Sequence, residues 1–338
     1  MSKKTKRKKR LTALLPAGAI ILGFLFVLSQ LSPVELQGSA REVVVNIPRE
    51  ATAGQVGDIL KQKDVIKSPF FFRLYARYRG LDGAIKAGEY RIPNSHSVPR
   101  VLSELVDGRL AVQTVTIPEG FTTEQVADLL AEKGVVDRDR FISVLAGDSF
   151  GYSFMDQIPS GSDRLEGYLF PDTYQFTRGS GERAIIDKML GRFEKEMVDL
   201  DYAEKAARVG LTLRHAVTVA SMIEREAKFD QERPLISGVI FNRLKLSMPL
   251  QIDATVQYAL HNHKEKIYYR DLEVDSPYNT YRVNGLPPGP IALPGRASLL
   301  AAVNPANSDY LYYVVKPDGT HAFASSLAEH DLNREKYQ

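Results

Sequence analysis

The chain has 338 residues, of which 44% are hydrophobic and 25% are charged, a composition that excludes a largely disordered protein. This length is enough for two or three domains with cores of their own. The first ten residues hold seven of the 44 Lys and Arg residues and no acid, so the remainder has 37 basic and 41 acidic residues, a net charge of −4. Nucleic-acid binding therefore loses its main electrostatic support.

The basic tail of residues 1–10 precedes an uncharged apolar segment, Leu11 to Leu31. A helix of this length spans a hydrocarbon core of roughly 30 Å. Positive charge before it predicts a cytoplasmic N-terminus and an external remainder. The alternative is a cleaved signal peptide with a site near Gly38-Ser39-Ala40, but the apolar run exceeds the usual length for one. We therefore expect a retained transmembrane helix over residues 11–31. The chain has no cysteine, which excludes disulfides.

Two segments repeat at an offset of 70 residues: Ile47 to Ile66 and Ile117 to Val136. Each predicts a strand, a turn and a helix with apolar residues at helical spacing. Two copies are too few for a solenoid, so we interpret them as a duplicated strand–helix unit. Between them the sequence predicts an aromatic helix, a strand and a further helix. Its aromatic residues suit either a core or the faces of sugar rings. Residues 42–111 are therefore predicted to form a small α+β module that binds an extended ligand.

Residues 165–174, LEGYLFPDTY, combine the acid Glu166 with aromatic residues and a Pro-Asp turn. Such a segment could pack two lobes together or form the wall of a carbohydrate cleft.

The helix predicted after Gly210 carries an acid on its apolar face. On a helical wheel Glu224 falls with Leu213 and Val217, whereas Glu226 falls on the opposite, exposed face. Burial disfavours a charged carboxylate, which is what a general acid near neutral pH requires. The alternative is a structural acid paired with an arginine.

The next helix places Asn242 in an apolar stripe, where its amide must find partners in Glu224, in a substrate or in another helix. Gln251 and Asp253 alternate with apolar residues, as on a half-buried strand. Asp253 could instead only cap the following helix.

The segment SPYNTYRVNGLPPGPIALPG follows, from Ser276 to Gly295. Its rings and amides, Tyr278, Asn279 and Tyr281 among them, suit a sugar, which has an apolar face and a rim of hydroxyls. The C-terminal part, from Tyr310 to Phe323, predicts a β-hairpin. With six His and no Cys, the sequence predicts neither a metal site nor a cofactor.

Several ordered motifs together resemble the MltG (YceG-like) endolytic murein transglycosylases: LEGYLFPDTY, ASMIEREAK, ERPLISGVIFNRL, MPLQIDATVQYAL, SPYNTY and GLPPGPIALPG. The resemblance runs from about Val43 to the C-terminus. It implies an α+β protein with an N-terminal transmembrane helix and a LysM-like module at residues 42–111. A mixed α/β catalytic domain with a partly lysozyme-like active site would then occupy residues 112–338.

The resemblance also implies the chemistry. The family's essential acid, the first Glu of its A-S-x-x-E segment, falls on Glu224 in this sequence. The expected reaction is endolytic cleavage of the β-1,4 bond between N-acetylmuramic acid and N-acetylglucosamine. It leaves 1,6-anhydro-N-acetylmuramic ends and ends glycan elongation. Residues expected to bind substrate are Asn242, Gln251, Asp253, Tyr278, Asn279, Tyr281 and Glu166. Where the family often has R-L-Q-T-D-P, this chain has Pro249-Leu250-Gln251-Ile252-Asp253-Ala254, which keeps Gln251 and Asp253.

The expected partners are peptidoglycan strands, the bacterial inner membrane and peptidoglycan synthases, with the catalytic domain in the periplasm. Because the attacking 6-hydroxyl belongs to the substrate, one carboxylate suffices. A membrane-anchored muramidase, the first alternative, needs a second carboxyl group, for which Asp253, Asp230 and Glu166 are candidates. A non-catalytic peptidoglycan-binding scaffold is the second alternative.

Overall fold

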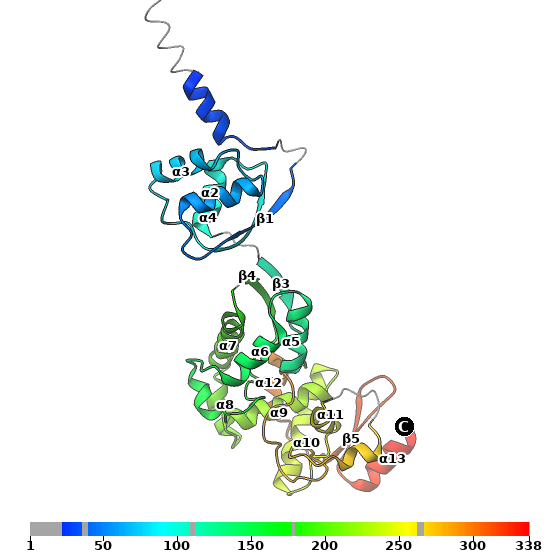
Figure 1. The fold of residues 1–338 in the computed structure, drawn as a ribbon. Coiled ribbons are helices and arrows are strands. Elements are labelled where there is room, and N and C mark those ends of the chain that lie inside the picture. The colour runs from blue at the N-terminus through cyan, green and yellow to red at the C-terminus, as the bar shows by residue number, and fades with distance from the viewer. Residues whose placement is uncertain (1–21, 36–39, 109–111, 178–179, 262–266, 338) are drawn as a thin grey trace, which may run out of the picture. The chain divides into compact units, whose positions relative to one another are not determined.

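The computed structural model describes residues 22–35, 40–108, 112–177, 180–261 and 267–337. The chain divides into two compact units, one formed by residues 1–113 with 176–180 and the other by residues 114–175 with 181–338. Figure 1 shows the elements of each. The predicted transmembrane segment begins outside the described residues. Within the described ranges, no helix is both long and apolar enough to cross a membrane.

The first unit contains a two-stranded antiparallel sheet and three helices. Strand β1 (Glu42–Ile47) pairs with β2 (Gly88–Pro93), so that Val45 lies opposite Tyr90. Between the strands the chain forms α2 (Ala53–Gln62) and α3 (Pro69–Tyr78), which pack together, and α4 (Val98–Asp107) follows β2. The alternation of β1 turns Val45 and Ile47 into a core that also contains Leu60, Phe72 and Tyr90.

The two copies of the sequence repeat fold alike at the local level. Copy one begins at the last residue of β1 and contains α2, and copy two begins directly after β3 (Val112–Thr116) and contains α5 (Thr123–Glu132). Both helices begin with a capping box, in which Thr52 pairs with Gln55 and Thr122 pairs with Gln125. The predicted strand–helix duplication is therefore present as two similarly capped helices.

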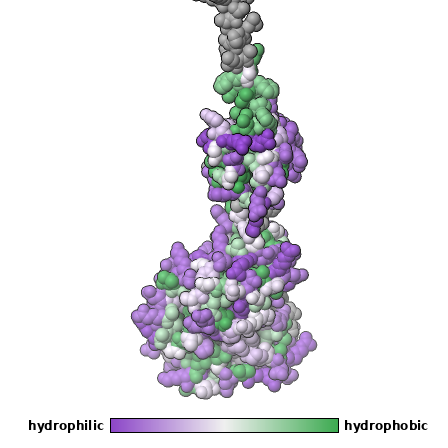
Figure 2. All heavy atoms as spheres, turned by 60° about the vertical axis from the view of Figure 1, so that its left-hand side comes forward, coloured by the Kyte–Doolittle hydropathy of each residue, from purple (hydrophilic) through white to green (hydrophobic). Residues whose placement is uncertain are grey.

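The remaining elements are predominantly helical, with two more two-stranded sheets: β3 pairs with β4, and β5 pairs antiparallel with β6. Their bounds are α6 (Arg138–Gly147), β4 (Thr173–Thr177), α7 (Glu182–Asp199), α8 (Tyr202–Arg208), α9 (Leu213–Glu226), α10 (Arg233–Lys245), α11 (Asp253–Ala259), α12 (Arg296–Val303), β5 (Tyr312–Val315), β6 (His321–Ala324) and α13 (Leu327–Tyr337). Short 3-10 turns lie at Ser153–Gln157, Asp230–Glu232 and Tyr269–Glu273. The mixed α+β class and the C-terminal hairpin agree with the sequence prediction. In the view of Figure 2, hydrophilic and hydrophobic residues are mixed over the surface of the second unit.

Helix α9 is the central element of the second unit. It packs against α8, α10, α11 and α12, and every residue from Ala216 to Ile223 is buried. Eight consecutive buried residues cover all sides of a helix, because 3.6 residues make one turn. A helical wheel therefore cannot separate a core face from a solvent face here.

The segment before α11 departs from the prediction. Residues 249–252 form no strand, and Asp253 is the first residue of α11. Gln251 has a positive φ of 52°, and its N–H donates to the Thr280 carbonyl at 3.1 Å. The alternation of polar and apolar residues that suggested a strand instead reflects an irregular turn into a helix.

Candidate active site

Glu224 lies in the C-terminal turn of α9, where polar contacts hold its buried carboxylate. Its side chain is 6% exposed, and its Oε1 lies 3.3 Å from Arg233 Nη1. The Gly295 N–H at the start of α12 donates to Oε2 at 2.9 Å. Arg233 also binds Asp230, at 3.0 Å from its Nε. Glu224 thus joins α9, α10 and α12, and it lines none of the three cavities described below.

A further acid, Glu119, belongs to this cluster and was not anticipated from the sequence. Partial burial and the negative charges of Glu224 and Asp230 raise the pKa of Glu119, whereas Arg233 opposes them. A Cβ atom at Gly295 would clash with the Glu119 carboxylate, so the glycine gives this carboxylate room. Three acids therefore share one arginine on this side of α9.

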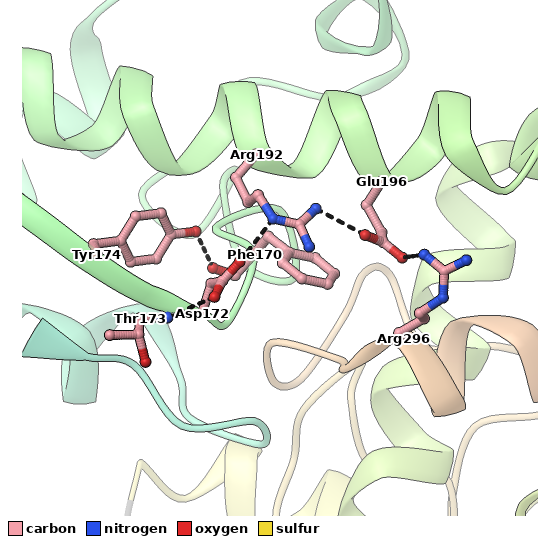
Figure 3. A network of polar contacts seen from close by, with 7 residues as sticks. All are labelled: Phe170, Asp172, Thr173, Tyr174, Arg192, Glu196 and Arg296. Atoms are coloured by element: carbon pink, nitrogen blue, oxygen red, sulfur yellow. Dashed lines mark hydrogen bonds and ion pairs between the residues drawn. The ribbon is translucent and has the colours of Figure 1, made fainter.

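A second polar network holds the beginning of α12 (Figure 3). Arg296 forms an ion pair with Glu196 on α7, whose side chain is 1% exposed. Arg192 Nη1 lies 2.7 Å from Glu196 Oε2, and its Nε lies 2.7 Å from Asp172 Oδ2. The Pro-Asp turn after LEGYLF is therefore linked through α7 to α12, and so to the Gly295 N–H that binds the acid on α9. The Pro-Asp turn therefore supports the site only indirectly.

Glu226 has a different environment from the exposed one that the helical wheel predicted. It is partly buried, and the Tyr313 hydroxyl on β5 donates to its Oε2 at 3.0 Å. Burial raises the pKa of Glu226, and the negative charge of Asp253 raises it further. The hydrogen bond from Tyr313 and the charge of His321 act in the opposite direction. The prediction of an exposed Glu226 is wrong because β5 and the start of α11 cover this end of α9.

His321 is held beside Glu226 by its contacts with the nearly buried carboxylate of Glu232. Its Nδ1 lies 2.9 Å from Glu232 Oε2, and its backbone N–H donates to Glu232 Oε1 at 2.8 Å. The side chains are 6% and 9% exposed, and the imidazole meets the Tyr313 ring edge-on, with centroids 5.3 Å apart. Both contacts hold the imidazole in one orientation.

Three cavities surround the C-terminal end of α9. The acidic cavity, of about 220 Å³, is lined by Glu124, Asp128, Asp163, Glu166, Arg225 and Gln257, among others. The central cavity, of about 340 Å³, includes Arg225, Glu226, Asp253, Gln257 and His321. The tyrosine cavity, of about 970 Å³, includes Glu226, Asp253, Tyr268, Tyr269, Tyr281 and Tyr313. Neighbouring cavities share wall residues: Arg225 and Gln257 line the acidic and central cavities, and Glu226 and Asp253 line the central and tyrosine cavities. The three cavities are together called the groove below.

Four of the predicted substrate-binding residues line this groove: Gln251, Asp253 and Tyr281 in the tyrosine cavity and Glu166 in the acidic cavity. The Tyr281 hydroxyl donates to Asp253 Oδ1 at 2.5 Å. Gln251 Oε1 accepts from Arg243 Nη1 at 3.3 Å. Asp253 is therefore oriented by a tyrosine rather than by a helix cap.

Glu166 is a buried acid with local donors. It is 2% exposed and accepts hydrogen bonds from the Thr123 backbone N–H at 3.1 Å and from Thr123 Oγ1 at 3.0 Å. Burial raises the pKa of Glu166 to about 8, although both hydrogen bonds act in the opposite direction. At neutral pH this wall of the acidic cavity therefore carries a protonated carboxyl group.

The other three predicted residues have structural contacts and line none of the three cavities. Asn242 donates to two backbone carbonyls of the segment before β5, at 2.8 and 2.9 Å. Asn279 is fully buried and donates to two carbonyls of its own loop, both at 2.8 Å. The Tyr278 ring packs on Tyr258, with centroids 4.9 Å apart. Their polar groups stabilise the loops that frame the groove.

Sequence reasoning missed Glu226, Tyr313 and His321 as groove residues. The available signal was weak: a second acid two residues after Glu224, and aromatic residues in the C-terminal hairpin. Among the described residues, no group of three or more His, Cys, Asp or Glu side chains could hold a metal ion.

The fold and groove can now be compared with known proteins. A model of the YceG-like family matches residues 45–336, and the chain belongs to this family. It is 35% identical over 331 residues to the endolytic murein transglycosylase of Bacillus subtilis (strain 168), covering 94% of this chain and 91% of that protein.

Two other relatives are similar over much of the chain. The endolytic murein transglycosylase of Streptococcus pneumoniae (strain D39) is 31% identical over 349 residues, and the match covers 95% of this chain and 62% of that longer protein. The crystal structure of a YceG-like protein from Listeria monocytogenes matches with a TM-score of 0.60 at 33% identity, covering 87% of this chain and 99% of that one.

Proposed function

We propose that this chain is an endolytic murein transglycosylase that cleaves the β-1,4 bond between N-acetylmuramic acid and N-acetylglucosamine within peptidoglycan strands. Membership of the family and the two transglycosylase relatives support the activity. The observation that carries the proposal in this chain is a partly buried acid with a raised pKa, Glu226, that lines two neighbouring cavities of the groove. An endolytic enzyme needs such a groove, because the strand extends beyond the cleaved bond in both directions.

Glu226 is the acid that the geometry favours over Glu224. A general acid must reach the leaving oxygen. Glu226 lines two cavities, whereas both carboxylate oxygens of Glu224 are engaged by Arg233 and Gly295. In this proposal Glu224, which the family resemblance singled out, holds the last turn of α9 in place beside its neighbour.

The proposed reaction proceeds through the substrate's own nucleophile. Protonated Glu226 donates its proton to the glycosidic oxygen as the bond from that oxygen to C1 of the muramyl residue breaks. The muramyl 6-hydroxyl then attacks C1, and the Glu226 carboxylate takes up the hydroxyl proton. No water is consumed, and the enzyme regains its starting protonation state. The Asp253 carboxylate in the same wall favours the protonated acid and stabilises positive charge that develops at C1.

A hydrolase remains the competing activity, and Asp253 is the observation that favours it. A second carboxylate near the acid could activate a water molecule. Mass spectrometry of products from uncrosslinked glycan strands decides between the two. Anhydro-muramyl ends, which lack the mass of one water molecule, are expected. Reducing muramyl ends would overturn the transglycosylase assignment, and an absence of turnover would favour a binding scaffold.

The first unit is proposed to bind glycan as a LysM-like module over residues 42–111. Its order of strand, two helices and strand supports this, as do the rings of Phe70 and Tyr78, which are 56% and 82% exposed. Sugar rings stack on such exposed faces. Binding of the full-length protein to purified strands, and its weakening in a Phe70→Ala, Tyr78→Ala double variant, would test the proposal.

The N-terminal segment is proposed to anchor the protein in the bacterial inner membrane, with the catalytic unit in the periplasm. The uncharged sequence from Leu11 to Leu31 after a basic tail supports this. Five large apolar side chains of this segment are 46–69% exposed, which suits an apolar surrounding: Leu22, Phe24, Leu25, Phe26 and Leu28. Peptidoglycan synthases are then the natural partners, since they release uncrosslinked strands at the same membrane face. Membrane fractionation tests the anchor.

A further inference from the structure

A buried carboxylate beside the groove is engaged entirely by one histidine. Glu232 ends the 3-10 turn before α10, and both of its carboxylate oxygens contact His321. Within the described ranges, no other hydrogen bond or ion pair reaches this carboxylate. Burial of a charged group costs free energy unless the group is paired, so the pair holds the histidine in a defined state at that cost.

A second histidine–glutamate pair shows that this arrangement is not simply a structural contact. In the first unit, His96 Nδ1 lies 3.1 Å from Glu104 Oε1, and Arg100 Nε lies 3.4 Å from the same oxygen. His96 and Glu104 line none of the three cavities. Glu104 therefore serves two cations away from the groove, whereas Glu232 serves one imidazole that lines two cavities.

The pair fixes which nitrogen of the imidazole carries the hydrogen atom. A carboxylate only accepts, so His321 Nδ1 donates to Glu232. In the neutral imidazole the other nitrogen, Nε2, then has a lone pair and can only accept. Nε2 has no hydrogen-bond partner in the described part of the chain. The rings of Tyr313 and Phe323, with centroids 5.3 and 6.2 Å from the imidazole, hold its orientation.

The central cavity offers this acceptor to a ligand. Its wall is built from the end of α9 and the two residues after it, from α11, and from the β5–β6 hairpin that carries His321. All of its wall residues belong to the described ranges. Its volume of about 340 Å³ is near the lower end of the range for ligand pockets, roughly 300–1,000 Å³. Such a cavity suits one sugar residue of a strand.

An amide N–H is the group that best fits a fixed acceptor. A hydroxyl group both donates and accepts, so it would bind either tautomer of the imidazole. An amide N–H only donates, so it binds one tautomer and not the other. Both N-acetylated sugars of a peptidoglycan strand carry such an N–H in their 2-acetamido group. A carboxylate that fixes the tautomer therefore gives selectivity toward the acetamido group and none toward a hydroxyl.

We propose that His321 Nε2 accepts a hydrogen bond from the 2-acetamido N–H of a sugar residue in the central cavity, and that Glu232 positions the imidazole for this contact. The inference rests on the proposed function, because it places a peptidoglycan strand in the groove. The contact fixes the orientation of that sugar ring beside Glu226, which lines the same cavity.

The first test compares binding of uncrosslinked strands to variants of the full-length protein. His321→Asn keeps an N–H near the position of Nδ1 but has no atom at the position of Nε2. It should weaken binding about two- to tenfold, as for one lost hydrogen bond. Glu232→Gln donates to Nδ1 and moves the imidazole hydrogen to Nε2, so it should weaken binding at least as much. His215→Asn is the matched control, because His215 is exposed on α9 and lines none of the three cavities.

The second test observes the imidazole itself. In ¹⁵N NMR at alkaline pH, where imidazoles are neutral, Nδ1 of His321 should carry the hydrogen in the unchanged protein and Nε2 should carry it in Glu232→Gln. The spectrum of His321→Asn assigns the signals. Addition of strand should shift the Nε2 signal of His321. This shift decides the inference even if Glu232→Gln does not fold.

Strand binding, including the NMR titration, is measured with Glu224 and Glu226 both changed to Gln, so that the strand stays intact whichever acid acts. Missing turnover by the unchanged protein would count against the proposed function, whereas the binding comparison decides the role of His321. Unchanged binding by His321→Asn, or an Nε2 signal that strand does not shift, would refute the inference. Weaker binding by His321→Asn with unchanged binding by Glu232→Gln would refute the acetamido assignment, because only a hydroxyl tolerates both tautomers.

Discussion

The two sides of the last turn of α9 differ although the acids they present are two residues apart. On one side Glu224 meets Arg233 and the Gly295 N–H, and its side chain is 6% exposed. On the other side Glu226 meets a neutral hydroxyl donor, Tyr313, and lines two cavities. The first carboxylate forms an ion pair with an arginine, whereas the second accepts a hydrogen bond from a hydroxyl group, and the charge of His321 lowers its pKa.

Under the proposed function, this difference distinguishes a structural acid from a chemical one. A carboxylate that neutralises a buried arginine stabilises the fold by remaining charged. A general acid must hold a proton at the working pH and release it to the substrate, which a partly dry wall without a paired cation favours. The comparison therefore predicts that changes on the Glu224 side affect stability and changes on the Glu226 side affect catalysis.

The largest expected effect comes from exchanging each acid for its amide. Glu226→Gln should lower kcat about 10²–10⁴-fold, the usual contribution of a general acid, with little change in stability. Glu224→Gln should retain kcat within about tenfold and lower the free energy of unfolding instead. Turnover of uncrosslinked strands and urea unfolding measure both. The reverse order of the two kcat values would return the catalytic role to Glu224, as the family resemblance predicted.

The second prediction concerns removal of Arg233, the cationic partner of Glu224. Arg233→Met leaves a buried carboxylate without its cation and should destabilise the protein by about 3–5 kcal/mol. Adding Glu224→Gln removes the unpaired charge, so the double variant should regain part of that loss in urea unfolding. If the double variant is as unstable as both single losses combined, the pair does not act as a unit.

A third acid shows what burial does without a cation. Glu166 has a folded pKa of about 8 against an ordinary 4.5, so between these values the folded state holds a proton that the unfolded state has lost. Its contribution to stability is therefore fully present below pH 4.5 and is lost as the pH rises toward 8, by at most about 1.4 kcal/mol per pH unit. Glu166→Gln should flatten this dependence in urea unfolding. The exposed Glu124→Gln, in the same cavity, should leave it intact.

The smallest effect is expected from removal of the Tyr313 hydroxyl, which donates to Glu226. Tyr313 favours the charged form of Glu226, so Tyr313→Phe should raise the pKa of Glu226 further. Activity that needs protonated Glu226 falls as the pH rises through this pKa, so the alkaline limb of the kcat profile should move to higher pH. Tyr310→Phe, on the same hairpin segment, should leave the limb in place. A limb that moves to lower pH would contradict the assignment.

Much of the local structure follows from the sequence because its causes are local. The repeat at an offset of 70 residues predicted two strand–helix units, and each helix begins with a capping box formed by residues three apart. The apolar spacing of the second unit's helices and the Lys-Pro-Asp-Gly turn of the β5–β6 hairpin are visible in the same way. The mixed α+β class and the family resemblance follow from such ordered motifs.

The groove was only partly predictable. Gln251, Asp253, Tyr281 and Glu166 were expected near substrate and line its walls. Asn242 was chosen as an amide in an apolar stripe and Asn279 as part of a loop of rings and amides, but backbone carbonyls satisfy both amides. A buried amide needs a partner, and the sequence does not say whether that partner is a ligand or the chain itself.

The choice between the two acids of α9 was made by tertiary structure. The sequence placed both carboxylates at the end of one helix, but the partners that distinguish them are distant in the chain: Gly295 lies 71 residues after Glu224, and Tyr313 lies 87 residues after Glu226. A helical wheel assumes one solvent face, and α9 has none over the eight buried residues before these acids. The sequence by itself therefore determined the family, the helices and the position of Glu224 and Glu226 at the end of one helix. Only the packing of α10, α12 and β5 around α9 decided which carboxylate is paired with a cation and which one faces the groove.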